Sequence, residues 1–133
     1  MTFRDRGIAF RADGRTHRNW HIAVGGTPVF DEGAIDDWRT DLNADGLVDL
    51  AVSGRDSCAS GGCLSAIYLN CGDGAHVTVL APRYIEALRP GTTRTTPAGE
   101  SWLDVKVHVK DRSHPSREGI RTVVWHFDGT TYR

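Results

Sequence analysis

Residues 102–110, WLDVKVHVK, alternate between apolar and polar side chains, and this alternation constrains the fold more than any other feature of the sequence. Successive side chains of a β-strand point to opposite faces of a sheet, so a period of two predicts a half-buried strand. The face that is expected to be buried contains Val105, Val107 and Val109. The face that is expected to be exposed contains Asp104, Lys106, His108 and Lys110. Residues 75–81 repeat the pattern, with Val77 on the buried side and His76 facing outward.

Further short apolar segments follow one another along the chain, with Gly- and Pro-containing turns between them. Residues 7–12 and 16–24 flank an Asp-Gly dipeptide and predict an opening hairpin. Residues 31–40 predict one or two helical turns, and residues 89–101 and 111–119 predict polar loops. The length suits one domain over 1–133. We therefore expect a mainly β fold, an antiparallel meander or sandwich with little helix.

The charge of the chain argues against several classes of partner. The formal net charge is −1, and basic and acidic residues are mixed along the sequence, so no basic field is expected for nucleic acid or an anionic membrane. No apolar run approaches the ~20 residues of a membrane span. The first residues lack the apolar core of a signal peptide, which read literally predicts a cytoplasmic protein, or else a protein from which the signal peptide has been removed.

The segment TDLNADGLVDLAV contains the most specific motif, D-x-N-x-D-G-x-x-D, over residues 41–49, which we call the acidic loop. Calcium prefers six to eight oxygen ligands, and alternate residues of a tight loop can direct oxygens to one centre. Gly46 permits the reversal of the chain, and Leu47 is expected to offer its carbonyl because its side chain enters the core. The predicted ligands are Asp41, Asn43, Asp45, Leu47 and Asp49. The alternative is an ordinary turn, in which Asp and Asn are common.

The acidic loop resembles the calcium loops of FG-GAP and integrin-type repeats, in which an aspartate at the ninth position completes the site and a strand follows at once. An EF-hand would instead need a glutamate at the twelfth position, where this chain has Val52. The resemblance implies a bound Ca²⁺. It covers about a dozen residues, and a single copy does not imply the propeller into which such repeats assemble.

A second resemblance is to short bacterial envelope proteins with one such loop, a cysteine pair and an aromatic tail. It rests on residues 41–49, 58–63 and 127–133. Some of these proteins resemble immunity proteins that neutralise peptidoglycan-cutting toxins. The resemblance implies a periplasmic or secreted protein that binds a cell-wall hydrolase.

The three cysteines allow two interpretations. Cys58 and Cys63 flank the short segment CASGGC, which suits a disulfide formed in an oxidising compartment. Cys71 is then left as a buried thiol. The alternative is a zinc site in which these three cysteines are joined by His76, although the spacing of the first two is looser than in usual zinc motifs.

No motif of a known catalytic site is found in the sequence, so we expect a binding protein and not an enzyme. The candidate partner-binding residues lie in the two predicted polar loops or at their border, and they are Arg89, Arg94, Arg112, Arg117 and Trp102. Arginines suit the carboxylates of a glycosidase cleft. Two alternatives remain: a carbohydrate-binding or adhesion module that stacks sugars on Trp38 or Trp102, and a metal-dependent hydrolase.

Overall fold

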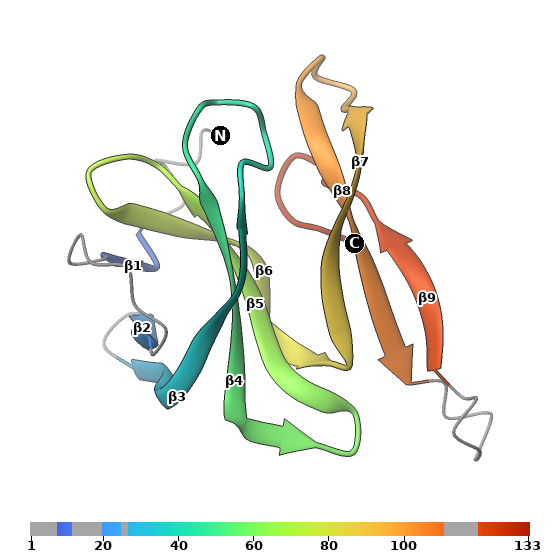
Figure 1. Ribbon diagram of the computed structural model, residues 1–133. Helices are drawn as coiled ribbons and strands as arrows, with labels where there is room; N and C mark the ends of the chain where they lie inside the picture. Colours follow the sequence, from blue (N-terminus) through green and yellow to red (C-terminus); the bar gives the residue numbers. More distant parts are fainter. Residues whose placement is uncertain (1–7, 12–19, 25–26, 111–119) are drawn as a thin grey trace.

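The computed structural model describes residues 8–11, 20–24, 27–110 and 120–133, and these residues form strands and turns with no helix (Figure 1). The mainly β, antiparallel fold expected from the sequence is confirmed. The strands are β1 (Phe10–Arg11), β2 (Trp20–Val24), β3 (Thr27–Thr40), β4 (Asp49–Ala59), β5 (Gly62–Asn70), β6 (Ala75–Ile85), β7 (Ala87–Thr95), β8 (Ser101–Lys110) and β9 (Ile120–Trp125).

Six strands form one antiparallel sheet in the order β1-β6-β5-β4-β3-β2. Strands β2 to β6 are a meander, because each pairs with its neighbour in the sequence. The expected opening hairpin is wrong, since β1 pairs with β6 and places Phe10 opposite His76. The expected helical turns at residues 31–40 are also wrong. That segment belongs to β3, where hydrogen bonding to β2 and β4 overrides a weak local preference.

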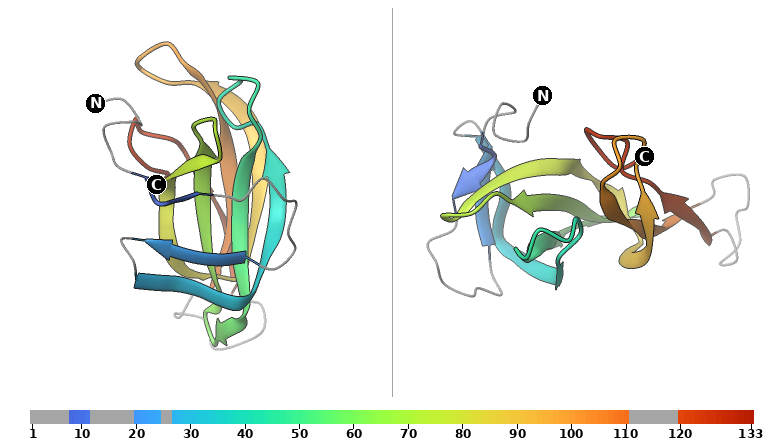
Figure 2. Two further views of the ribbon diagram at one scale, coloured as in Figure 1. Left: turned by 90° about the vertical axis from the view of Figure 1, so that its left-hand side faces the viewer. Right: turned by 90° about the horizontal axis from the view of Figure 1, so that it is seen from above.

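The remaining strands form a second antiparallel sheet in the order β7-β8-β9. Only Glu86 separates β6 from β7, so the chain passes directly from one sheet to the other (Figure 2). Residues 89–95 are part of β7 and pair with β8, which corrects the expectation of a loop over 89–101. The expected loop at 111–119 lies outside the described residues.

One core joins the two sheets, and it contains buried residues of both together with the acidic loop and the C-terminal segment. Its members are Leu42, Ala51, Ile67, Leu69, Val77, Val79, Leu80, Ile85, Leu88, Trp102, Val105, Val107, Phe127 and Tyr132. A smaller cluster covers the other face of the larger sheet, around Phe30 and Tyr68. The two clusters account for the near-continuous apolar sequence of β5, which is buried on both faces.

The alternation in β8 is confirmed for its valines, since Val105 and Val107 are fully buried while Lys106 and Lys110 are exposed. Two polar residues differ from expectation. Asp104 is buried, where it contacts His126 Nδ1 at 2.8 Å and Arg94 Nε at 3.6 Å. His76 is also buried, because Phe10 of β1 stacks on its ring with centroids 4.5 Å apart.

The C-terminal segment closes one end of the core. Tyr132 donates its backbone N–H to the carbonyl of Val79 and its hydroxyl to the carbonyl of Leu103, at 2.9 and 2.7 Å. Burial raises the pKa of this hydroxyl. The tail therefore joins β6 of the larger sheet to β8 of the smaller one.

Candidate functional site

The acidic loop connects β3 to β4 at the end of the molecule where β7 turns into β8 (Figure 1). The side chain of Leu42 is 1% exposed and belongs to the shared core. Its carbonyl accepts a hydrogen bond from the backbone N–H of Leu103 in β8, at 2.8 Å. One residue therefore fixes the start of the loop to both sheets.

Asp49 closes the loop from its other end. Its carboxylate is buried and accepts two backbone hydrogen bonds, from Leu42 N to Oδ2 at 2.7 Å and from Asn70 N to Oδ1 at 2.9 Å. The pKa of Asp49 is raised to about 7, mainly because burial disfavours the charged form, against the two backbone hydrogen bonds that lower it. Repulsion from Asp45 and Asp41 raises it further, so the charges of the three carboxylates interact.

The other two aspartates hold the turn of the loop. Asp41 accepts hydrogen bonds from the backbone N–H groups of Gly46 at 2.8 Å and Asp45 at 3.3 Å, and Asp45 accepts one from Leu47 at 2.9 Å. Gly46 has a φ of 83°, which confirms the reversal expected at this position, and Ala44 has a φ of 58°. The backbone N–H groups of the loop thus surround carboxylate oxygens.

The side chain of Asn43 contributes a further oxygen to the acidic loop. Its side-chain Oδ1 is buried, and within the described residues it has no hydrogen-bond partner. A buried polar atom without a partner costs free energy, so such atoms often mark the place of a bound water or ion. The orphaned atom is one of the predicted calcium ligands.

Among the residues that the structure describes, no three Asp, Glu, His or Cys side chains form a group that could hold a metal ion. The role expected for the Leu47 side chain is wrong, because it is 37% exposed and Leu42 is the leucine that enters the core. The structure therefore brings the predicted ligands into one loop, with Asp41 and Asp45 directed to backbone N–H groups.

The disulfide between Cys58 and Cys63 is confirmed, and it joins directly paired positions of β4 and β5. The zinc alternative is thereby excluded, because a disulfide leaves these two sulfurs without the thiolates that zinc requires. Cys71 takes no part in the disulfide and is partly buried against the shared core. Its Sγ lies 3.7 Å from the carbonyl of Leu69.

The candidate partner-binding arginines are only partly described. Arg89 and Arg94 are exposed on β7, where Arg89 donates to the carbonyl of Leu88 at 2.8 Å and Arg94 contacts Asp104. Arg112 and Arg117 lie outside the described residues. The two described arginines lie on a strand, where the sequence predicted a loop.

Trp102 and Trp38 do not form the exposed platform that a sugar would need. The candidate partner-binding role of Trp102 is wrong, since the side chain is 1% exposed and its ring stacks on Phe127 with centroids 3.7 Å apart. Trp38 is partly buried against the shared core, and its Nε1 donates to the carbonyl of Leu88 at 2.9 Å. Both rings therefore serve the packing of one sheet on the other.

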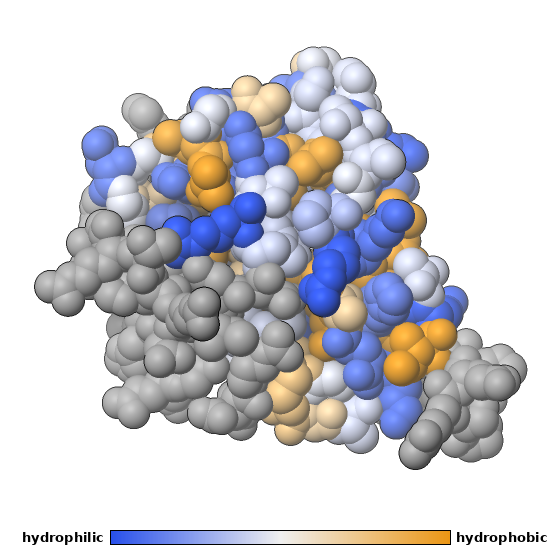
Figure 3. All heavy atoms as spheres, in the orientation of Figure 1, coloured by the Kyte–Doolittle hydropathy of each residue, from blue (hydrophilic) through white to orange (hydrophobic). Residues whose placement is uncertain are grey.

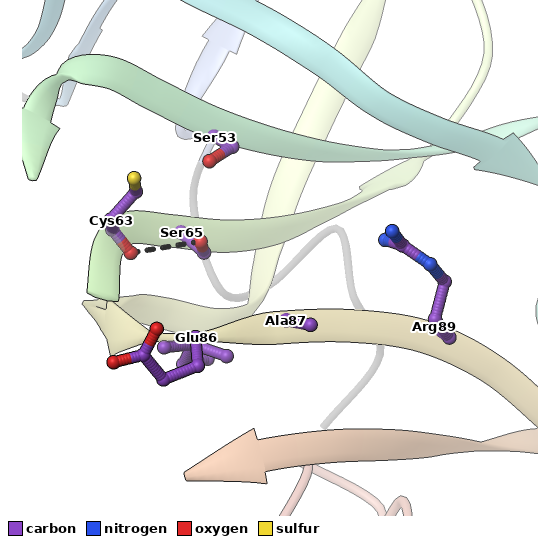
Figure 4. Close-up of a pocket in the computed structure, with 7 residues that line it drawn as sticks. Ser53, Cys63, Ser65, Glu86, Ala87 and Arg89 are labelled. Carbon is purple, nitrogen blue, oxygen red and sulfur yellow. Dashed lines mark hydrogen bonds between the residues drawn. The ribbon is translucent and has the colours of Figure 1, made fainter. Parts of the chain in front are cut away.

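A small polar cavity lies between β4, β5 and the start of β7 (Figure 4). The buried side chains of Ser53 and Ser65 line it, and Ser65 donates to the carbonyl of Cys63 at 3.0 Å. Glu86 and Arg89 lie at opposite ends of the cavity in this view. Its volume of about 50 Å³ is room for a few water molecules and is too small for a sugar ring.

Sequence reasoning missed two residues that shape the acidic loop. Asn70 donates its backbone N–H to Asp49 and its side-chain amide to the carbonyl of Val48, at 2.9 and 3.2 Å. Leu42 supplies the core contact that had been assigned to Leu47. A signal for Asn70 was present in the turn sequence NCGDG, but its contact with the acidic loop depends on the pairing of β4 with β5.

No protein-family model, curated protein or solved structure matches this chain. The likeness to FG-GAP loops therefore rests on the residues of the acidic loop themselves. Within the described residues, no helix has both the length and the hydropathy of a membrane-crossing segment.

Proposed function

We propose that this protein is a non-catalytic, calcium-binding domain of the bacterial envelope that binds and inhibits a peptidoglycan-degrading enzyme. The observation that carries the calcium part is the buried, unpartnered Oδ1 of Asn43 in a loop whose three carboxylates interact electrostatically. The partner part rests on the resemblance to envelope proteins and on the exposed arginines of β7.

The donor chemistry of the acidic loop fits calcium. Asp41, Asn43, Asp45 and Asp49 would hold the ion through side-chain oxygens and Leu47 through its carbonyl. Each carboxylate oxygen that accepts one backbone hydrogen bond retains a second lone pair. When bound, the ion would neutralise the repulsion among the carboxylates, which adds to the main effect of burial in raising the pKa of Asp49. Its role is structural, because Asp49 and Leu42 connect the loop to β5 and β8.

The disulfide supports an envelope location. Cys58 and Cys63 are joined across a hairpin, and disulfides persist in oxidising compartments such as the periplasm. Such a location also supplies calcium at higher concentrations than a cytoplasm does, which suits a site with three carboxylates.

The inhibitory role is proposed to depend on exposed cations of the smaller sheet. Arg89 and Arg94 point from the same strand and suit the paired carboxylates that glycosidases use for catalysis. Burial of such a contact in an enzyme cleft excludes substrate without any chemistry by the inhibitor.

Inhibition assays with a panel of purified muramidases and amidases test this proposal. We expect at least one enzyme to lose activity and to co-elute with the protein in calcium buffer. Arg89→Glu is expected to abolish inhibition, whereas Arg39→Glu, on the larger sheet, keeps it. If neither the rate nor the elution volume of any enzyme in the panel changes, the inhibitory role is wrong.

A further inference from the structure

The smaller sheet is more basic than the chain as a whole. Strands β7, β8 and β9 contain five basic residues and one acidic residue, a net charge of +4, although the whole chain has −1. The segment 111–119 between β8 and β9 contains two acidic and two basic residues and adds no net charge. The strands of the smaller sheet are therefore net positive within a chain that is slightly negative overall.

The register of β8 and β9 places cations beside exposed aliphatic residues. Lys106 is paired with Val124, and Lys110 is paired with Ile120. Directly paired residues of an antiparallel sheet point to the same face. This is the face opposite the buried Val105 and Val107, so we call Lys106, Lys110, Ile120 and Val124 the outer face of the smaller sheet.

This outer face is open to solvent in the part of the chain that the structure describes. Both lysines are exposed, and Ile120 and Val124 are 48% and 47% exposed. Hydrophobic residues adjoin hydrophilic ones on the surface over β8 and β9 (Figure 3). An edge strand with exposed hydrophobic side chains is a template on which a strand of another molecule can pair.

Strand β9 is itself the edge of the sheet, since among the described strands it pairs with β8 and with no other. Its second row of backbone N–H and C=O groups can therefore pair with a strand of another molecule. We propose that β9 and the outer face together form a docking surface for an acidic, extended segment of a protein partner. The incoming strand would extend the sheet, with its carboxylates near Lys106 and Lys110 and its apolar side chains on Ile120 and Val124.

The pattern of residues favours an acidic protein over the other occupants. A second copy of this chain, paired through β9 about a twofold axis, would bring two basic sheets together, and like charges oppose association. Nucleic acid is bound mainly through phosphates and base stacking, neither of which uses exposed Ile and Val. Backbone pairing combined with alternate side-chain contacts is instead the usual way in which a sheet edge binds a peptide.

A peptide of alternating glutamate and valine, matching the six residues of β9, is a suitable probe. We expect the fluorescein-labelled peptide to bind with an affinity that falls as salt rises. Lys106→Glu combined with Lys110→Glu should weaken binding by about tenfold, because two attractions become repulsions. Arg39→Glu, an exposed charge reversal on the larger sheet, should leave it within about twofold of the unchanged protein.

Carbodiimide coupling gives the location of the peptide directly. Lys106 and Lys110 are the two lysines of the chain, so a cross-link from a glutamate to a lysine marks the outer face. Circular dichroism of each variant checks that it is folded. Binding that survives reversal of both lysines overturns the proposal, as does equal binding of a DNA oligonucleotide or of phosphatidylglycerol vesicles.

The identity of the natural partner rests on the proposed function, whereas the docking surface does not. If the hydrolases fail to bind and the peptide still binds at the lysines, the inhibitory role is wrong and the docking surface stands. If hydrolases are inhibited but the peptide does not bind at the lysines, the docking surface is wrong and inhibition uses another face.

Discussion

The carboxylate of Asp49 accepts a hydrogen bond from the backbone N–H of Leu42, at 2.7 Å, and this contact closes the acidic loop from inside the protein. Because Asp49 also binds the N–H of Asn70, one buried side chain joins the loop to the end of β5. The exposed part of the loop then contains Asp45, which is free of such buried contacts. The loop therefore has a structural half and a half that is directed to solvent.

Asp49→Ala is expected to destabilise the protein by about 2 kcal/mol even when calcium is removed by a chelator. The substitution leaves two backbone N–H groups without an acceptor, and each such loss costs about 1–3 kcal/mol, partly offset by removal of a buried charge. Urea unfolding in chelator measures the change. Asp45→Ala is the control and should change stability by less than about 0.5 kcal/mol under the same conditions.

Gly62→Ala is expected to cost at least about 2 kcal/mol, because Gly62 has a φ of 109° and an added Cβ would collide with the carbonyl of Ile85. Gly61 is the matched control in the same turn. There a Cβ would meet only Tyr84 Cβ, at an ordinary 3.8 Å, so Gly61→Ala should be tolerated. Thermal unfolding of both variants makes the comparison, and equal melting temperatures would contradict the described hairpin.

Trp102→Ala is expected to destabilise the protein by roughly 3–5 kcal/mol, as for other large buried aromatics. The ring contacts Phe127 and Tyr132, so its loss opens a cavity where the two sheets meet. Tyr84→Ala removes an aromatic ring that is 53% exposed and should cost less than about 1 kcal/mol. If chemical denaturation shows a smaller loss of stability for Trp102→Ala than for Tyr84→Ala, the buried position of Trp102 is contradicted.

His76 is expected to make stability depend on pH. Burial lowers the pKa of His76 below its usual 6.5, and the positive charge of Arg39 acts in the same direction against a hydrogen bond to Gly74. Below pH 6.5 the unfolded chain therefore binds a proton that the folded protein does not. The free energy of unfolding should fall as pH decreases from 6.5 toward the lowered pKa, and this contribution should be constant above 6.5.

The measurement is urea unfolding of the protein and of His76→Gln across roughly pH 5 to 8, where histidine titrates. The difference between the two curves isolates His76 from the other titrating groups. Parallel curves would show that His76 is accessible to protons in the folded state.

The parts of the fold that depend on local pattern were predictable. The period of two in β8 needs only alternating side chains, and the reversal at Gly46 needs only a residue that tolerates a positive φ. The disulfide was predictable because Cys58 and Cys63 are so near in the sequence. In each case the cause lies within a few residues of the effect.

The parts that depend on distant partners were not predictable. Phe10 stacks on His76 and removes it from solvent, although the two residues are far apart in the sequence. Asp104 is buried because His126 and Arg94 approach it from other segments. Either Leu42 or Leu47 could have anchored the acidic loop in the core. The choice depends on the fact that β8 passes beside the loop, which the sequence does not show.

Calcium titration by isothermal calorimetry of the protein and of Asp45→Ala tests the central claim most directly, because Asp45 is exposed and its loss leaves the buried contacts of Asp49 intact. We expect one calcium ion to bind the unchanged protein with measurable heat and a higher melting temperature, and the variant to bind at least about tenfold more weakly. Absence of calcium binding at millimolar concentration, or equal binding by the variant, would contradict the proposed site.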